Sequence, residues 1–318
     1  MQFRTVEDDV VAVELDVGPE HVPGMVLEHV APRRLRLVVG DAPLLWARLD
    51  DCLFDVGTIV SRASDSPSVL PPLRAEEARA RRGPAAWLTW VADGLRKSAR
   101  APLRYGSWQL TWYVPRMARR VWPLPQHYFA GYASADPDHA PPIEDLLASV
   151  RRQRVHWEPM NLNGARTVHP LRVPSPPDAP RVKAWRKHAS AATLPPIVLW
   201  WVDPLSQHLV LDGHDRLSAA AAEGTRPDVV VLWQCRYLRP EDTHDRRSYI
   251  EGYEQAHARS TTPLETKRAL NRSLADWHRP VAYPLTTSVH RPRHAERWRR
   301  EVRAALGPGH DHLAAFLG

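Results

Sequence analysis

Five consecutive residues in the second half of the chain have types and spacing suited to holding an anion. They are Asp212, Gly213, His214, Asp215 and Arg216, and they follow an apolar run. An Asp-Gly turn that opens a helix leaves backbone N–H groups without partners, and these groups and the helix dipole attract a phosphate. Gly213 has no side chain to keep the phosphate away, Arg216 lies one turn into the helix, and the carboxylates could add Mg²⁺. In the alternative interpretation Asp212 only caps the helix and Arg216 only forms a surface ion pair, and spacing does not separate the two.

The elements expected around this turn form one compact unit. The apolar run Ile197 to Val202 predicts a buried strand, Pro204 to Gln207 a turn, and His208 to Leu211 a second strand. A helix is expected from 214 to its C-cap at Gly224, followed by a third strand over Val229 to Trp233. Strand, turn, strand, tight turn, helix and strand would therefore place the five residues at the junction of the second strand and the helix.

This unit resembles the core of the ParB/sulfiredoxin superfamily. The sequences LPPIVLWWVD and HLVLDGHDRLSAA match the family's Pro-Pro-Ile strand and its Gly-x-x-Arg helix start. Val168 to Val173 resembles the family's first strand and Arg181 to His188 its first helix, so the resemblance covers about residues 165–236. It implies a mixed α/β core, and it does not by itself imply one activity.

The members of the superfamily differ at the turn. Sulfiredoxins have a catalytic cysteine where this chain has His214, so the resemblance does not imply sulfiredoxin chemistry. Chromosome-partitioning ParB proteins bind CTP at the turn and continue into a helix-turn-helix, which residues 241–278 do not show. The Asp-Gly-His-x-Arg form is similar to that of ParB-like free-serine kinases and of other ParB-like proteins.

The resemblance to these kinases implies a nucleoside triphosphate with Mg²⁺, an unknown small-molecule acceptor, and either phosphoryl transfer or nucleotide hydrolysis. Asp212 would act as general base or as Mg²⁺ ligand, and His214 would hydrogen-bond the substrate or the phosphate. The residues that would hold the nucleotide are Gly213, Asp215, Arg216, Arg172 and Arg181. The kinases also use a glutamate near the first strand, where the nearby candidate is Glu158, in a different local sequence.

A second hypothesis rests on a basic, tryptophan-rich stretch over residues 74–122. It holds eleven basic side chains, interleaved with Trp108, Trp112, Tyr113 and Trp122. Bases stack on aromatic rings and arginine neutralises phosphate, so the stretch could be the surface of a DNA-associated or nuclease-like ParB-like protein. In the simpler interpretation the tryptophans belong to the core and the arginines to its solvated rim. A ParB-like scaffold that only mediates protein contacts is a third possibility.

Composition and charge divide the chain and limit the classes of protein. Residues 1–60 carry eleven acids and five arginines, a net charge of −6, so the rest carries +13. We expect an α+β protein: 1–70 an acidic β-rich part with a small antiparallel sheet, 71–150 mostly helical, 151–240 the ParB/sulfiredoxin-like core, and 241–318 helical. Cys52 and Cys235 show no disulfide or zinc spacing, and neither a membrane-length apolar run nor a signal peptide is visible. These features predict a cytoplasmic protein with no membrane partner.

Overall fold

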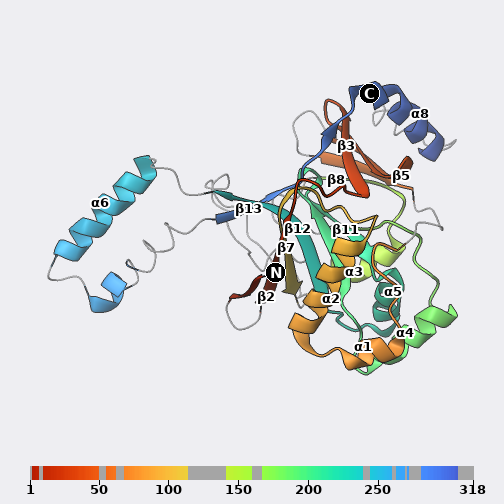
Figure 1. Ribbon diagram of the computed structural model, residues 1–318, viewed down its shortest axis with the longest axis horizontal. Coiled ribbons are helices and arrows are strands. Elements are labelled where there is room, and N and C mark those ends of the chain that lie inside the picture. Colours follow the sequence, from red (N-terminus) through yellow and green to blue (C-terminus); the bar gives the residue numbers. More distant parts are fainter. Residues whose placement is uncertain are drawn as a thin grey trace.

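The computed structural model describes residues 2–6, 10–49, 55–61, 68–113, 141–159, 167–238, 244–259, 263–268, 271 and 281–306. Within them the chain is α+β, as expected, and its strands form two sheets (Figure 1). The larger sheet has the order β1-β2-β7-β12-β10-β11-β9, with β13 also paired to β12. Its strands are β1 Gln2–Val6, β2 Val10–Val17, β7 Gly106–Tyr113, β9 Val168–Pro170, β10 Ile197–Val202, β11 Gln207–Asp212, β12 Val229–Leu238 and β13 Val281–Leu285.

The unit predicted around the turn is present in the larger sheet. β10 and β11 are antiparallel neighbours joined by a short 3-10 turn, η4 (Asp203–Leu205), and β10 runs parallel to β12. All six residues of β10 are buried, and they alternate between two apolar clusters on the two faces of the sheet. A strand that is covered on both faces needs a continuous apolar sequence, which is why the run was recognisable. Helix α5 (His214–Glu223) follows β11 directly and ends at Gly224 in the left-handed conformation.

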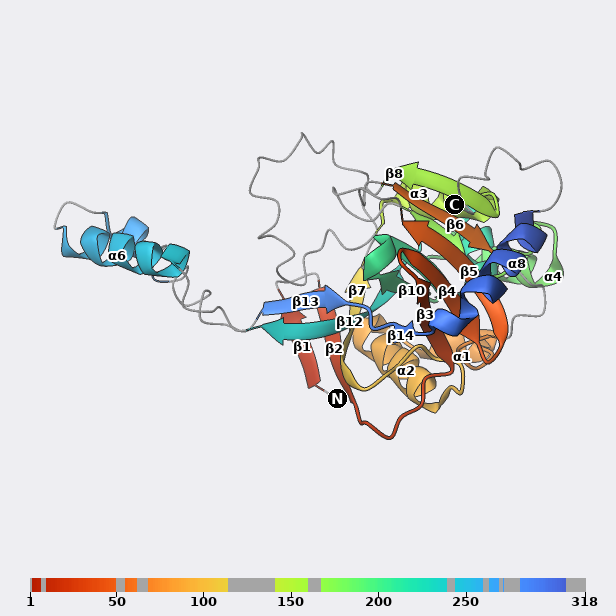
Figure 2. The ribbon, with the colours of Figure 1, turned by 90° about the horizontal axis from the view of Figure 1, so that it is seen from above.

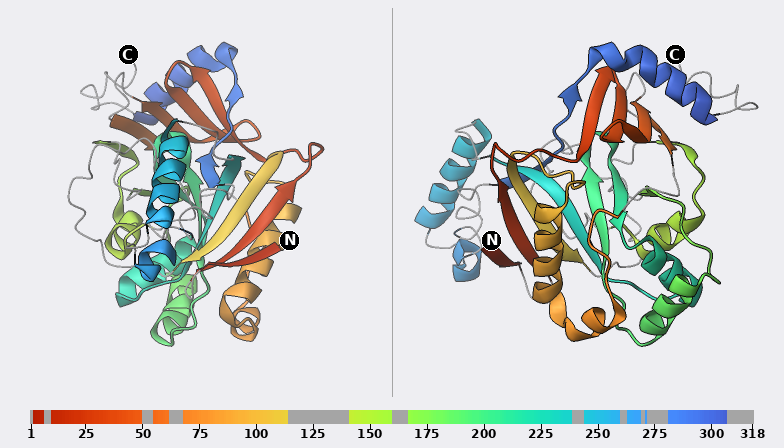
Figure 3. Two further views of the ribbon diagram at one scale, coloured as in Figure 1. Left: turned by 90° about the vertical axis from the view of Figure 1, so that its left-hand side faces the viewer. Right: turned by 45° about the vertical axis from the view of Figure 1, so that its right-hand side comes forward.

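The first predicted strand and helix of the core also form, as β9 and as α4 (Pro180–Ser190). α4 lies beside α5 (Figure 3), and Arg186 of α4 forms an ion pair with Glu223 of α5. The short helices α3 (Ile143–Ala148) and η3 (Ser149–Arg151) precede the core, and Leu146 of α3 shares an apolar cluster with Leu217 of α5.

The segment 71–150 differs from the mostly helical prediction at its centre. Helices α1 (Ala75–Ala80) and α2 (Gly83–Lys97) form as expected and meet next to Gly83-Pro84. β7 then runs through the larger sheet between β2 and β12, with Trp108, Leu110 and Trp112 in one apolar cluster. Large apolar side chains at every second position suit a strand in the interior of a sheet. One of the two neighbouring strands, β12, lies more than 100 residues away in the sequence.

The N-terminal part is also divided between the two sheets instead of forming one small sheet. β2 belongs to the larger sheet, whereas the later strands belong to a smaller sheet of order β14-β3-β4-β5-β6-β8. Its strands are β3 Met25–Ala31, β4 Arg34–Val39, β5 Ala42–Leu49, β6 Asp55–Val60, β8 Val155–Pro159 and β14 Val289–His290. One face of this sheet shares the main apolar cluster with the larger sheet and α2.

The C-terminal helix α8 (Ala295–Leu306) covers the other face of the smaller sheet (Figure 3). Its apolar stripe of Trp298, Val302 and Leu306 packs on Val30, Trp46 and Ile59. A short 3-10 turn, η5 (Pro292–His294), leads into it. This stripe repeats every four residues along the helix, and it is buried.

The remaining C-terminal elements are partly strands, in contrast to the helical prediction. β12 and β13 form an antiparallel ribbon, and α6 (His244–Ala258) lies beyond its end, apart from the two sheets (Figure 2). From this part of the chain, Pro240, Thr262, Leu270, Leu274 and Trp277 lie outside the described residues. In the part of the chain that the structure describes, no helix is both long and apolar enough to cross a membrane.

Candidate functional site

The turn between β11 and α5 has a backbone conformation that favours glycine. Gly213 has φ +94°, in the left-handed region, and it is the N-cap of α5. The guanidinium of Arg216 is folded back over it: a Cβ at this position would lie 2.9 Å from an Arg216 nitrogen. The turn therefore holds Arg216 against the backbone at the start of the helix.

Asp212 is the partner of Arg216. One of its carboxylate oxygens accepts a hydrogen bond from Arg216 at 2.6 Å, and the other accepts one from Ser68 Oγ at 3.0 Å. Burial raises the pKa of Asp212, but the charge of Arg216 and the hydrogen bonds from Arg216 and Ser68 lower it more, so the pKa lies below its ordinary value. Asp212 is therefore an ionised carboxylate whose two oxygens both accept hydrogen bonds, and it is a weak base.

Arg216 itself is almost fully buried, with 5 % of its side chain exposed. Its guanidinium lies 6.0 Å from the centre of the Trp185 ring on α4, a distance suited to a cation–π contact. Its Nε has no hydrogen-bond partner among the described residues. The ion pair of the alternative interpretation is therefore present, but it is buried and not on the surface. The Nε–H group of Arg216 remains available to donate a hydrogen bond to a ligand.

Asp215 brings the two predicted arginines to the turn. Its Oδ2 lies 3.4 Å from Arg172 and 3.1 Å from Arg181, while its Oδ1 is buried and unpartnered within the described residues. Arg172 follows β9 and Arg181 lies in the first turn of α4. The five residues of the turn and both arginines predicted by the resemblance thus lie together in the structure.

His214 is the buried, uncharged member of the group. Its exposed fraction is 4 %, and burial together with the nearby positive charge of Arg172 lowers its pKa to about 3. The imidazole is therefore neutral near pH 7, when it can donate or accept a hydrogen bond but cannot supply a proton as an acid. Its Nε2 is buried without a hydrogen-bond partner in the described part of the chain.

The N-terminus of α5 adds backbone donors to this group. Gly213 has no side chain and no other side chain caps the helix, so the first N–H groups of the helix have no side-chain acceptor among the described residues. Leu217 N–H, one turn later, donates to Gly213 O at 2.8 Å and begins the helical ladder. Uncapped donors next to a buried imidazole are an arrangement that binds an anion.

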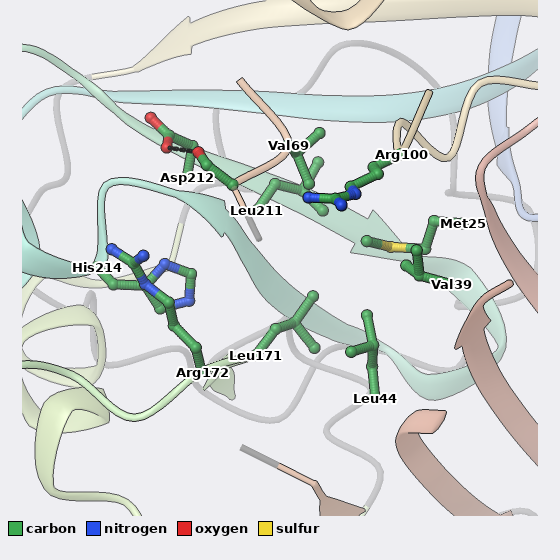
Figure 4. A pocket seen from close by; sticks show the side chains of 11 residues that line it. Met25, Val39, Leu44, Val69, Arg100, Leu171, Arg172, Leu211, Asp212 and His214 are labelled. Atoms are coloured by element: carbon green, nitrogen blue, oxygen red, sulfur yellow. Dashed lines mark hydrogen bonds between the residues drawn. The ribbon is translucent and has the colours of Figure 1, made fainter. Parts of the chain in front are cut away.

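A pocket adjoins the turn and extends to the smaller sheet (Figure 4). Asp212, His214 and Arg172 line one end, and the opposite wall is apolar and comes from β3, β4 and β5, with side chains Met25, Val39 and Leu44. Its volume of about 20 Å³ is room for about one water molecule, so part of a phosphate group fits and a base or a sugar does not.

Two residues of the pocket were not predicted from the sequence. Ser68 hydrogen-bonds Asp212, and Arg100 points from the connection between α2 and β7 toward the middle of the pocket (Figure 4). Both lie more than 100 positions from the turn, and no local motif marks either of them. Only the packing of the smaller sheet and α2 against the core brings them to the site.

The predicted Mg²⁺ ligand does not fit a metal in this arrangement. Both oxygens of Asp212 already accept hydrogen bonds, and a cation there would have to displace Arg216. The described residues contain no group of three or more His, Cys, Asp or Glu side chains placed to hold a metal ion. The candidate glutamate, Glu158, lies on β8 and pairs with Val56 of β6 in the smaller sheet. The position of its side chain is not described.

The aromatic residues of the proposed DNA surface are largely part of the core. Trp108, Trp112 and Tyr113 are buried in β7 and cannot stack on bases, and Trp122 lies outside the described residues. Arg81 lies over the rings of Trp87 and Trp90 of α2, at 5.7 and 5.5 Å. For β7 the simpler interpretation, core tryptophans, is the one that the packing supports.

Comparison of the chain with protein-family models, with curated proteins and with solved structures gave no match.

Proposed function

We propose that the chain binds a nucleotide, and that it holds the phosphates of the nucleotide at the turn formed by Gly213 and Arg216. The observation that carries the proposal is the buried, unpartnered Nε2 of His214 beside the uncapped N-terminus of α5. A neutral imidazole and backbone N–H groups can donate hydrogen bonds to phosphate oxygens without a charge of their own. No other described group accepts from that nitrogen.

The charge of the site supports an anionic ligand. Arg100, Arg172, Arg181 and Arg216 surround the turn and the pocket, whereas the carboxylates beside them are Asp212 and Asp215. With His214 neutral, these six groups sum to +2. A phosphate group with two negative charges would balance them, and arginine is well suited to bind it.

The electrostatics favour binding over phosphoryl transfer. A general base or acid works best with a pKa near the working pH. The pKa of His214 is about 3 and that of Asp212 lies below its ordinary value, so neither group is tuned for proton transfer near neutral pH. A kinase or hydrolase reaction and a bound Mg²⁺ therefore form no part of the proposal.

Isothermal titration calorimetry with ATP, CTP and GTP, each with and without Mg²⁺, tests the proposal. Arg181→Ala removes a half-exposed arginine that contacts Asp215, so the fold should persist while the affinity falls by about tenfold, the value of one modest charge-assisted contact. Arg186→Ala is the matched control, because Arg186 lies on the same helix and pairs with Glu223 away from the turn. Absence of heat with every nucleotide, or equal losses in the two variants, would contradict the proposal.

A further inference from the structure

Arg100 is a cation of the pocket that lies outside the ParB/sulfiredoxin-like core. It comes from the connection between α2 and β7, and its side chain lines the pocket together with Arg172 and His214 (Figure 4). Within the described part of the chain its guanidinium has no hydrogen bond and no ion pair. It faces the pocket with its charge uncompensated by a described carboxylate.

The backbone that carries Arg100 is held in place by Gly24 at the start of β3. Gly24 N–H and Met25 N–H both donate to Ala101 O, at 3.0 and 3.2 Å. A Cβ on Gly24 would lie 1.8 Å from Ala99 O and 2.5 Å from Arg100 Cα. The two segments approach so closely that only glycine fits, and Arg100 is thereby positioned before any ligand arrives.

The surroundings of Arg100 strengthen its attraction for an anion. The neighbouring wall consists of Met25, Val39 and Leu44, and charge–charge interactions are stronger beside apolar side chains than in water. The turn lies at one end of the pocket and this wall at the other. An anionic group that projects from the turn into the pocket would thus meet Arg100.

We infer that Arg100 binds the terminal phosphate of the nucleotide, so that the pocket selects ligands by the length of their phosphate chain. This inference rests on the proposed function, and it adds which part of the ligand enters the pocket. The phosphates nearer the sugar interact with the turn and Arg172, and the terminal phosphate pairs with Arg100. The pocket has room for part of a phosphate group only, so the terminal phosphate reaches into it while the base and the sugar remain outside.

Calorimetric titration with AMP, ADP and ATP tests the inference. The wild type is expected to bind ATP more tightly than ADP and ADP more tightly than AMP. Arg100→Gln, which keeps much of the length and removes the charge, should weaken ATP by about tenfold and leave AMP unchanged. Arg96→Gln is the control, because Arg96 is exposed on α2 and lies outside the pocket.

A second variant separates position from charge. Gly24→Ala retains the arginine but forces the segment around Ala99 and Arg100 away from β3, so it should reproduce the loss for ATP alone. Circular dichroism and the melting temperature show whether this variant is folded. If it is not folded, the comparison of Arg100→Gln with the wild type tests the inference. If the wild type binds all three nucleotides and Arg100→Gln lowers the three affinities equally, or lowers none of them, this inference alone is overturned. Failure of the wild type to bind any nucleotide overturns the proposed function as well.

Discussion

At the scale of single residues, His214 shows what burial does to a titratable side chain. Its imidazole is enclosed at the start of α5, next to Arg172 and Arg216, and among the described residues Asp212 is the one charge that favours its protonation. The folded protein therefore keeps it neutral, whereas an unfolded chain would protonate it near its ordinary pKa of about 6.5. The stability of the protein should depend on this difference.

We predict that His214→Gln removes a pH-dependent loss of stability. Between about pH 6.5 and 3, His214 is protonated in the unfolded wild type but not in the folded protein. The free energy of unfolding therefore falls as the pH falls, by up to about 1.4 kcal/mol per pH unit. Glutamine does not titrate and lacks this loss. Urea unfolding of both proteins from pH 7.5 to 4.5 measures the difference.

Two partly buried aspartates affect the pH dependence of stability in the opposite direction, and both are present in the wild type and in the variant. Burial raises the pKa of Asp203 and of Asp228 to about 6, so they stabilise the fold at low pH and this contribution is lost as the pH rises from about 4 to 6. Their effect cancels in the comparison of wild type and variant. A stability difference that does not change with pH would show that His214 is protonated equally in both states.

The local part of the site could be predicted from the sequence, and its distant part could not. Asp212, Gly213 and Arg216 are neighbours along the chain, so a turn signal before a helix suffices to bring them together. Ser68 and Arg100 reach the same site only through packing between elements far apart in sequence. The burial of Arg216 against Trp185, which distinguishes its pair with Asp212 from an ordinary surface ion pair, likewise depends on tertiary structure.

At the scale of elements, α8 is attached to the smaller sheet by a buried polar network as well as by its apolar face. Glu301 of α8 accepts two hydrogen bonds from Arg36 of β4, each at 2.8 Å, and one from Trp46 Nε1 of β5 at 2.8 Å. Arg36 is 1 % exposed and also pairs with Glu28 at 3.0 Å. A buried arginine shared by two carboxylates makes the loss of either one costly.

Glu301→Gln should therefore destabilise the protein by about 3 kcal/mol, because it leaves part of the charge of buried Arg36 uncompensated. Glu296→Gln on the same helix is the matched control: its pair with Arg299 is exposed, and we expect a change below about 1 kcal/mol. Urea unfolding of both variants gives the two values. Equal destabilisation would mean that the network contributes no more than a surface pair.

Helices and strands whose own sequence has a strong apolar pattern could be predicted. Strands that form only by pairing with strands distant in the sequence could not. The continuous apolar sequence of β10 and the stripe of Trp298, Val302 and Leu306 on α8 each show their structure within a few residues. β7 was missed because its tryptophans suit a strand only when β2 and β12 cover its sides. β13 and β14 were missed for the same reason, since each pairs with a strand far from it in sequence.

At the scale of the whole molecule, the segments suggested by composition share their sheets. The larger sheet takes β1 and β2 from residues 1–70, β7 from 71–150, β9 to β12 from 151–240 and β13 from the C-terminal part. The smaller sheet likewise combines β3 to β6 with β8 and β14. The class was predictable from the alternation of patterns, whereas pairing between distant strands leaves no local signal.

We expect that residues 151–240 do not fold by themselves, although they contain strands β9 to β12 and helices α4 and α5. Without β7, the long strand β12 loses its antiparallel partner over Val229 to Cys235 and exposes Trp233. Circular dichroism, cooperative urea unfolding and the dispersion of amide NMR signals of this fragment test the expectation. A dispersed spectrum with cooperative unfolding would show that the core is an independent domain.

The pocket has one wall in each sheet, and this has a consequence for how distant parts of the molecule communicate. Its polar end belongs to β11 and α5 of the larger sheet, and its apolar wall belongs to β3, β4 and β5 of the smaller one. A ligand held by both ends would be a cross-link between the sheets, and by thermodynamic linkage it would raise the temperature at which they separate. Because thermodynamic linkage is reciprocal, a change in α8, which packs on the smaller sheet but contributes no residue to the pocket, would then also change the affinity for such a ligand.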